Sequence, residues 1–202
     1  MKKLILFLFI CCLLAVFAGC NNIAEESVRQ IALMELSPSQ QQIVDLFTHQ
    51  GQEFLVFEYS GDVFTEIEVW IEIYHYGQSE GIYVNLHTIS TQPMETQPIA
   101  ISISRTIQNE FKWSISIGGS RASDISWTAE EGHYASISGS INEPVEIINN
   151  EEIILHISKF LTINPSTATT VSTMGNIQDY LLEPELFADF TYVHVIKARF
   201  NY

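Results

Sequence analysis

The chain has 202 residues, of which 24 are acidic and nine are Lys or Arg, so its formal net charge is −15 at pH 7. This acidity argues against nucleic-acid binding, which requires a basic surface. Apolar residues make up 47% of the chain, a content typical of globular rather than disordered proteins. The length predicts a single domain.

The first twenty residues have the three-part pattern of a secretory signal peptide. Lys2 and Lys3 supply positive charge, residues 4–17 form an uncharged apolar run, and small residues follow. The run is shorter than the roughly 20 apolar residues that span a bilayer core. The sequence Phe17-Ala18-Gly19-Cys20 resembles the lipobox of bacterial lipoproteins, with Phe in place of the usual Leu.

This resemblance implies that residues 1–19 are removed and that the Cys20 thiol receives a diacylglycerol carrying fatty acids such as palmitate. Cys11 and Cys12 leave with the signal peptide, so Cys20 is the sole thiol of the mature chain and has no internal disulfide partner. Loss of two Lys residues changes the formal charge to −17. We expect a protein anchored through Cys20 to the extracytoplasmic face of the cell membrane, similar in layout to small Gram-positive lipoproteins.

After the lipid-modified residue, we expect a tether over residues 20–36 and a single β-rich domain over 37–202. Residues 31–34 form an apolar group that suits either a frayed helix or a first docked segment. The capping box formed by Ser37 and Gln40, with Pro38 at the first helical position, predicts a short helix over 38–49.

From residue 53 onward the apolar pattern has a period of two, which indicates β-strands. Residues 66–76 alternate most regularly, which is typical of an antiparallel strand with one solvated face. One face carries Ile67, Val69, Ile71 and Ile73, and the other carries Glu66, Glu68, Trp70, Glu72 and Tyr74. Further strand segments lie at 54–59, 82–89, 99–104, 111–117, 125–129, 134–141, 145–148, 153–160 and 191–200. About nine short strands separated by turn residues predict a β-sandwich or a barrel-like fold, with a helical turn within 178–188.

Motifs that would indicate catalysis are missing from the sequence. It contains no phosphate-binding glycine loop, zinc-protease motif, EF-hand loop or nucleophile elbow. None of the six His residues pairs with another at metal-ligand spacing, and we interpret them as isolated side chains. We therefore predict no catalytic residue, no metal and no cofactor. A Ser-His-acid site is defined by geometry, which spacing alone does not test.

The aromatic residues Trp70, Tyr74 and Tyr76 are the candidate ligand-binding residues. If their sheet face is open, they would stack on sugar rings, and if the 38–49 helix covers it, they would be packing residues. We expect a non-enzymatic module whose partner is an envelope protein or glycan. The alternatives are a module that binds cell-wall carbohydrate and an acidic inhibitor of a cationic envelope enzyme.

Overall fold

The computed structural model describes residues 28–47, 52–61, 64–94, 97–106, 110–130, 132–163 and 174–202. Residues 1–19 and Cys20 lie outside these ranges. No helix within the described residues combines the length and apolar character needed to span a bilayer. The elements are β1 (Gln30–Leu33), α2 (Pro38–Phe47), β2 (Gln52–Ser60), β3 (Phe64–His75), β4 (Gln78–Met94), β5 (Ile99–Arg105), β6 (Glu110–Ile117), β7 (Ser120–Thr128), β8 (Tyr134–Ser140), β9 (Val145–Glu146), β10 (Glu152–Thr162), α3 (Asp179–Leu182), η1 (Pro184–Phe187) and β11 (Tyr192–Asn201).

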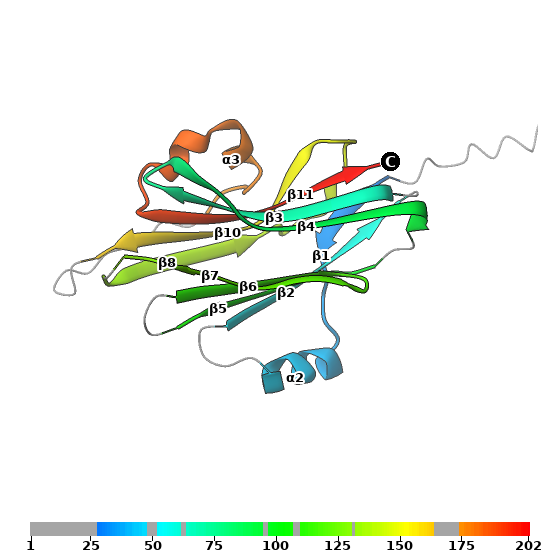
Figure 1. Ribbon diagram of the computed structural model, residues 1–202, viewed down its shortest axis with the longest axis horizontal. Helices are drawn as coiled ribbons and strands as arrows, with labels where there is room; N and C mark the ends of the chain where they lie inside the picture. The colour runs from blue at the N-terminus through cyan, green and yellow to red at the C-terminus, as the bar shows by residue number, and fades with distance from the viewer. Residues whose placement is uncertain are drawn as a thin grey trace, which may run out of the picture.

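Two antiparallel sheets pack face to face, which confirms the predicted β-sandwich (Figure 1). The six-stranded sheet has the order β7-β6-β5-β2-β1-β9, and the five-stranded sheet has the order β4-β3-β11-β10-β8. Strand β3 shows how the sequence specifies the layers, since all four of its alternating isoleucine and valine residues are fully buried between the sheets. The alternating apolar residues of β5 and β6 meet them from the other sheet.

Strand β1 settles the open question about residues 31–34. It lies between β2 and β9, with Ile31 paired to Tyr59 on one side and to Val145 on the other. Ile31 is fully buried. This part of the expected tether therefore belongs to the sheet, because a single buried apolar side chain and ladder hydrogen bonds on both edges are enough to fix a four-residue strand.

The helix expected over 38–49 is present as α2. Its capping box forms as the sequence indicated: the Ser37 backbone N–H donates to Gln40 Oε1 at 2.8 Å, and the Gln40 N–H donates to Ser37 Oγ at 3.4 Å. The helix stands on the side of the six-stranded sheet, away from the face that carries Trp70 (Figure 1). It therefore does not cover that face.

The segment that packs on the outer face of the five-stranded sheet is instead the one containing α3 and η1 (Figure 1). The Phe187 ring lies 4.7 Å from the Tyr74 ring, and Tyr180 stacks on Phe187 at 5.3 Å. The Lys159 amine lies 3.9 Å from the centre of the Tyr180 ring. This cover explains why residues 153–160 of β10 and 192–198 of β11 are buried on both faces.

Candidate functional site

The three aromatic residues predicted as a ligand platform do not form one open surface. Trp70 is 3% exposed and Tyr74 is 9% exposed. Tyr74 lies under Phe187, and the Arg199 guanidinium lies 5.2 Å from the Trp70 ring centre. Both rings are packing residues in this conformation.

Tyr76 lies in the turn between β3 and β4, not on the strand face where the sequence placed it. Tyr76 and Gly77 have φ values of 45° and 77°, which suit the two-residue turn of a tight hairpin. The Tyr76 side chain is 57% exposed and rests against His75, with ring centres 4.8 Å apart. A Cβ at Gly77 would lie 3.1 Å from Ala188 Cα, so the turn fits closely against the chain that follows η1.

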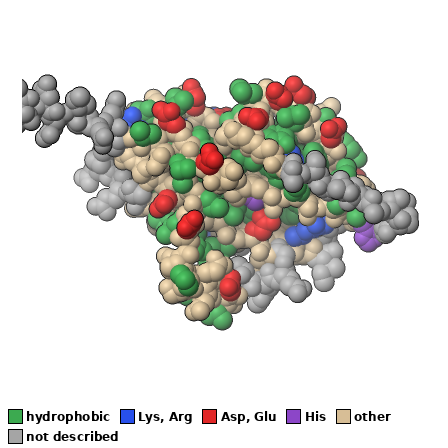
Figure 2. All heavy atoms as spheres, turned by 180° about the vertical axis from the view of Figure 1, so that it is seen from behind, with side chains coloured by type: hydrophobic (Ala, Val, Ile, Leu, Met, Phe, Trp, Pro, Cys, Tyr) green, Lys and Arg blue, Asp and Glu red, His purple; other side chains and the backbone are tan. Residues whose placement is uncertain are grey.

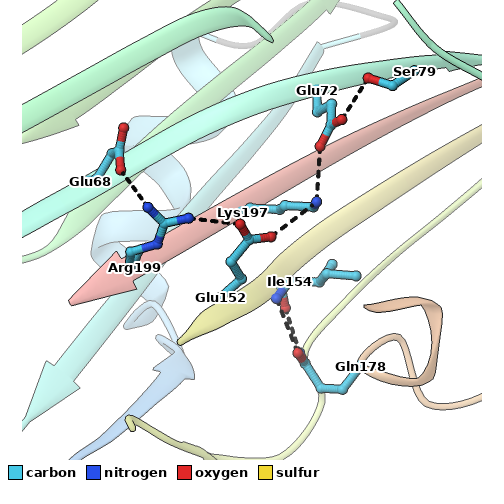
Figure 3. Close-up of polar contacts among 8 residues, drawn as sticks. All are labelled: Glu68, Glu72, Ser79, Glu152, Ile154, Gln178, Lys197 and Arg199. Carbon is cyan, nitrogen blue, oxygen red and sulfur yellow. Dashed lines mark hydrogen bonds and ion pairs between the residues drawn. The ribbon is translucent and has the colours of Figure 1, made fainter. Parts of the chain in front are cut away.

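Around Trp70, the outer face of the five-stranded sheet carries a ladder of ion pairs (Figure 3). The Lys197 amine lies 2.9 Å from a Glu72 oxygen and 3.2 Å from a Glu152 oxygen. Arg199 donates to Glu152 at 2.8 Å and lies 3.5 Å from Glu68. Three strands thus contribute to one network, in which cations on β11 separate carboxylates on β3 and β10.

Within the ladder, Glu72 and Lys197 favour each other's charged form although both are partly buried. Burial opposes ionisation of Glu72, but hydrogen bonds from Ser79 and Lys197 outweigh it, so the pKa of Glu72 lies below its usual value. Burial likewise favours neutral Lys197, and the Glu72 hydrogen bond and charge raise the pKa of Lys197 above its usual value. The two groups therefore hold each other in the ionised form.

Sequence reasoning identified the carboxylates of β3 but missed Lys197, Arg199 and Glu152. The sequence does contain one indication of this network. Lys197 and Arg199 lie two positions apart in the last strand and so share one face, and opposite charges are favoured across neighbouring strands. What was not available is the pairing of β11 with β3, which sets Trp70 opposite Lys197.

Gln178 connects the cover segment to the sheet next to this ladder (Figure 3). Its side-chain amide accepts from the Ile154 N–H at 3.0 Å and donates to the Ile154 carbonyl at 2.6 Å. The β8–β10 pairing begins at Ser140 and His156, beyond this point. Gln178 therefore continues the hydrogen bonding of β10 where its neighbouring strand ends.

A polar group between the sheets has the residue types of a catalytic triad but the wrong geometry. His156 Nε2 lies 2.9 Å from Ser158 Oγ and 3.4 Å from a Glu53 oxygen, while its Nδ1 lies 2.9 Å from Ser140 Oγ. In a triad, the acid and the nucleophile hydrogen-bond to opposite ring nitrogens. Here Ser158 and Glu53 share Nε2. Ser140 is opposite Glu53, but it lies at Nδ1, the position that the acid takes in a triad, so the two nitrogens have exchanged roles. His156 is 2% exposed, and burial lowers its pKa to about 4.

His194 is the second buried imidazole, and it is surrounded by aromatic rings. Ring centres lie 4.7–5.3 Å away, and they belong to Phe111, Trp113, Trp127 and Phe160. Within the described residues, neither of its ring nitrogens has a hydrogen-bond partner. Burial lowers the pKa of His194 to about 3, so the ring is neutral.

The described surface has two adjoining hollows beside β8, of about 460 and 320 Å³. Both include Asn142, Met174 and Gly175. Glu143 is the one ionisable residue among the described residues that line them. Among the described residues, no cluster of three or more His, Cys, Asp or Glu side chains suits a metal ion.

Each of the seven Lys and Arg residues from Arg29 onward is engaged within the protein. Besides the two cations of the ladder and Lys159, Arg29 lies 3.9 Å from the Tyr202 ring centre, Lys112 pairs with Glu110, and Arg121 donates to Ser114. Arg105 lies 5.5–5.9 Å from three ring centres between the sheets. Carboxylates are spread over the face seen in Figure 2.

These features define an acidic β-sandwich protein with an ion-pair ladder and a helical cover on the outer face of its five-stranded sheet. The chain belongs to the YgaN domain family, whose model matches residues 30–181. The match begins at the first residue of β1 and ends within α3, so it includes most of both sheets and Gln178. No curated protein and no solved structure matches the chain.

Proposed function

We propose that this protein is a lipid-anchored module on the extracytoplasmic face of the cell membrane, which binds an envelope partner without catalysing a reaction. The signal-peptide pattern and Cys20 support the location. The observation that carries the binding role is that the cations are engaged internally while exposed carboxylates remain in excess. Such a surface attracts cationic partners and repels anionic polymers.

The anchor is tested by mass spectrometry of the protein from the membrane fraction. We expect the mature chain to begin at Cys20 and to carry a diacylglycerol. Changing Cys20→Ser should leave an unprocessed precursor that lacks the lipid. Normal processing and membrane retention of the Cys20→Ser protein would refute lipid anchoring.

A cationic envelope enzyme is the partner class that the charge distribution favours, which makes an acidic inhibitor the second candidate. The probe is a lysozyme-type muramidase added to the full chain in vesicles. We expect retention that weakens as salt rises, because salt screens exposed charges. The same muramidase with acetylated lysines is the matched control, since acetylation removes its charge.

Equal retention of the native and acetylated enzymes, or retention that salt does not weaken, would refute a charge-steered partner. Loss of muramidase activity in the complex would separate inhibition from binding alone.

Because Trp70 and Tyr74 are enclosed, neither ring can stack on a sugar without displacing its neighbours, and we do not propose carbohydrate binding.

A further inference from the structure

Helix α2 exposes apolar side chains that an amphipathic helix normally buries. Ile43 is 56% exposed and Leu46 is 75% exposed. They lie three positions apart and therefore share one face of the helix. The helix lies on the side of the six-stranded sheet (Figure 1), and both side chains are open to solvent.

The polar side of α2 is almost free of charge. Residues 38–47 contain Ser39, three glutamines and Asp45 but neither Lys nor Arg. Gln41 donates to the Asp45 carboxylate at 2.7 Å. The chain has a formal net charge of −15, but the surface of α2 is nearly neutral and apolar. A cationic protein would be drawn to the carboxylates elsewhere, whereas an apolar boundary matches this helix.

A second copy of the chain is a poor occupant of this surface. Ten helical residues extend about 15 Å, and contact between two such helices buries far less than the roughly 1,200 Å² of a stable interface. A bilayer requires no matching partner helix. Its headgroup–acyl boundary accepts apolar side chains from a helix that lies in its plane.

The length of the chain before β1 also permits contact with the membrane. Ten residue steps lead from Cys20 to Gln30, and an extended chain covers up to about 33 Å over them. Eight residue steps lead from Gln30 to Pro38, and the distance between these two residues cannot exceed about 26 Å. A lipid on Cys20 therefore leaves enough chain for α2 to reach the same membrane surface.

We propose that α2 lies in the outer surface of the membrane, with Ile43 and Leu46 inserted at the headgroup–acyl boundary. This inference rests on the lipid anchor of the proposed function. The helix adds a second point of attachment, so the sandwich is held in one orientation. The side carrying α3 and η1 then faces away from the bilayer.

The test uses the full acylated chain in vesicles of phosphatidylcholine with a minor fraction of phosphatidylglycerol. Once Cys20 is acylated, Leu46→Cys provides a unique thiol for an environment-sensitive fluorophore. Leu182→Cys is the matched control, because Leu182 is 84% exposed on α3, across the sandwich from α2. Acrylamide, a neutral quencher, reports the exposure of each label to water.

We expect the label at position 46 to shift to the blue and to be quenched several-fold less than the label at 182. Adding Ile43→Ser should abolish this protection without changing the unfolding temperature, because Ile43 is exposed. Since α2 has no basic residue, removing phosphatidylglycerol should not reduce the protection. Equal quenching at both positions, or protection at position 46 in vesicle-free protein, would overturn the proposal.

Mass spectrometry of the same sample separates the two proposals. An acylated chain with equal quenching at both positions refutes the docking of α2 and leaves the lipid anchor standing. A chain without acylation refutes the anchor, and with it the arrangement proposed here.

Discussion

The two buried imidazoles couple the stability of this protein to pH. An unfolded histidine has a pKa of about 6.5, whereas burial lowers the pKa values of folded His194 and His156 to about 3 and about 4. Below pH 6.5 the unfolded chain therefore binds protons that the folded protein excludes. The resulting loss of stability begins near pH 6.5 as pH falls and continues to the folded pKa values.

We predict that lowering the pH from 7.5 to 5 reduces the free energy of unfolding by about 2 kcal/mol for each of these two histidines. Replacing His194→Phe should remove the part of this pH-dependent loss that His194 causes, because the aromatic surroundings accept an apolar ring. Urea unfolding at a series of pH values measures this. As a control, His133→Phe, at an exposed position, should leave the pH dependence unchanged. An unchanged slope in His194→Phe would contradict the prediction.

Lys197 holds two carboxylates together on the outer face of the sheet. We predict that Lys197→Met lowers the free energy of unfolding by about 2–4 kcal/mol, because Glu72 and Glu152 lose their shared partner in a partly buried site. The matched control is Lys112→Met, whose pair with Glu110 is more exposed. It should cost at most about 1 kcal/mol.

A double-mutant cycle isolates the contribution of the pair. Adding Glu72→Gln to Lys197→Met should recover part of the lost stability, since one unpaired carboxylate is removed. Strictly additive effects of the two substitutions, measured by urea unfolding, would show that the two side chains are not coupled.

At this scale the sequence predicted which side of β3 each residue faces but not which residues it would meet. The alternation is local, so Glu66, Glu68 and Glu72 could be assigned to the face opposite the isoleucines. The register with β11 depends on a strand more than a hundred residues later. The sequence left open whether Trp70 and Tyr74 are exposed or covered by the 38–49 helix; the two rings are buried, but that helix is not what covers them.

Among the elements, the β8–β10 side of the sheet depends on a side chain for its continuity. Gln178 satisfies both backbone groups of Ile154 and thereby ties α3 to the sheet. The sequence indicated helical structure within 178–188. It did not predict this contact, because a single glutamine side chain that hydrogen-bonds to a strand edge leaves no periodic pattern in the sequence. By contrast, α2 was predictable from its capping box, since those hydrogen bonds form between near neighbours in sequence.

We predict that Gln178→Ala lowers the free energy of unfolding by about 1–3 kcal/mol, because two hydrogen bonds are lost and a part-buried N–H is left without a partner. The Ile154 amide should also exchange hydrogen faster than its neighbours in β10. Gln41→Ala removes a comparable but exposed side-chain contact in α2 and should have little effect on global stability. Unchanged exchange at Ile154 would contradict the role assigned to Gln178.

For the molecule as a whole, the sequence predicted the sandwich because its strands alternate and are separated by turn residues. It did not predict the distribution of charge. Composition fixes the acidic excess, but folding decides which carboxylates are neutralised. The ladder uses two of the seven Lys and Arg residues from Arg29 onward to pair carboxylates on β3 and β10. Exposed acids such as Glu183 and Glu185 on the cover segment add to the repulsion at the surface.

We therefore predict that moderate salt stabilises this protein. Salt screens repulsion between exposed carboxylates, while partly buried pairs such as Lys197–Glu72 are screened less. A gain of about 1 kcal/mol would raise the unfolding temperature by roughly 2–4 °C in a domain of this size. Thermal unfolding at pH 7.5 over a salt series measures the effect, and Glu183→Gln with Glu185→Gln should reduce it. A melting temperature that falls with salt would mean that the ion pairs outweigh the surface repulsion, and the acidic surface would then not be the dominant electrostatic feature of the fold.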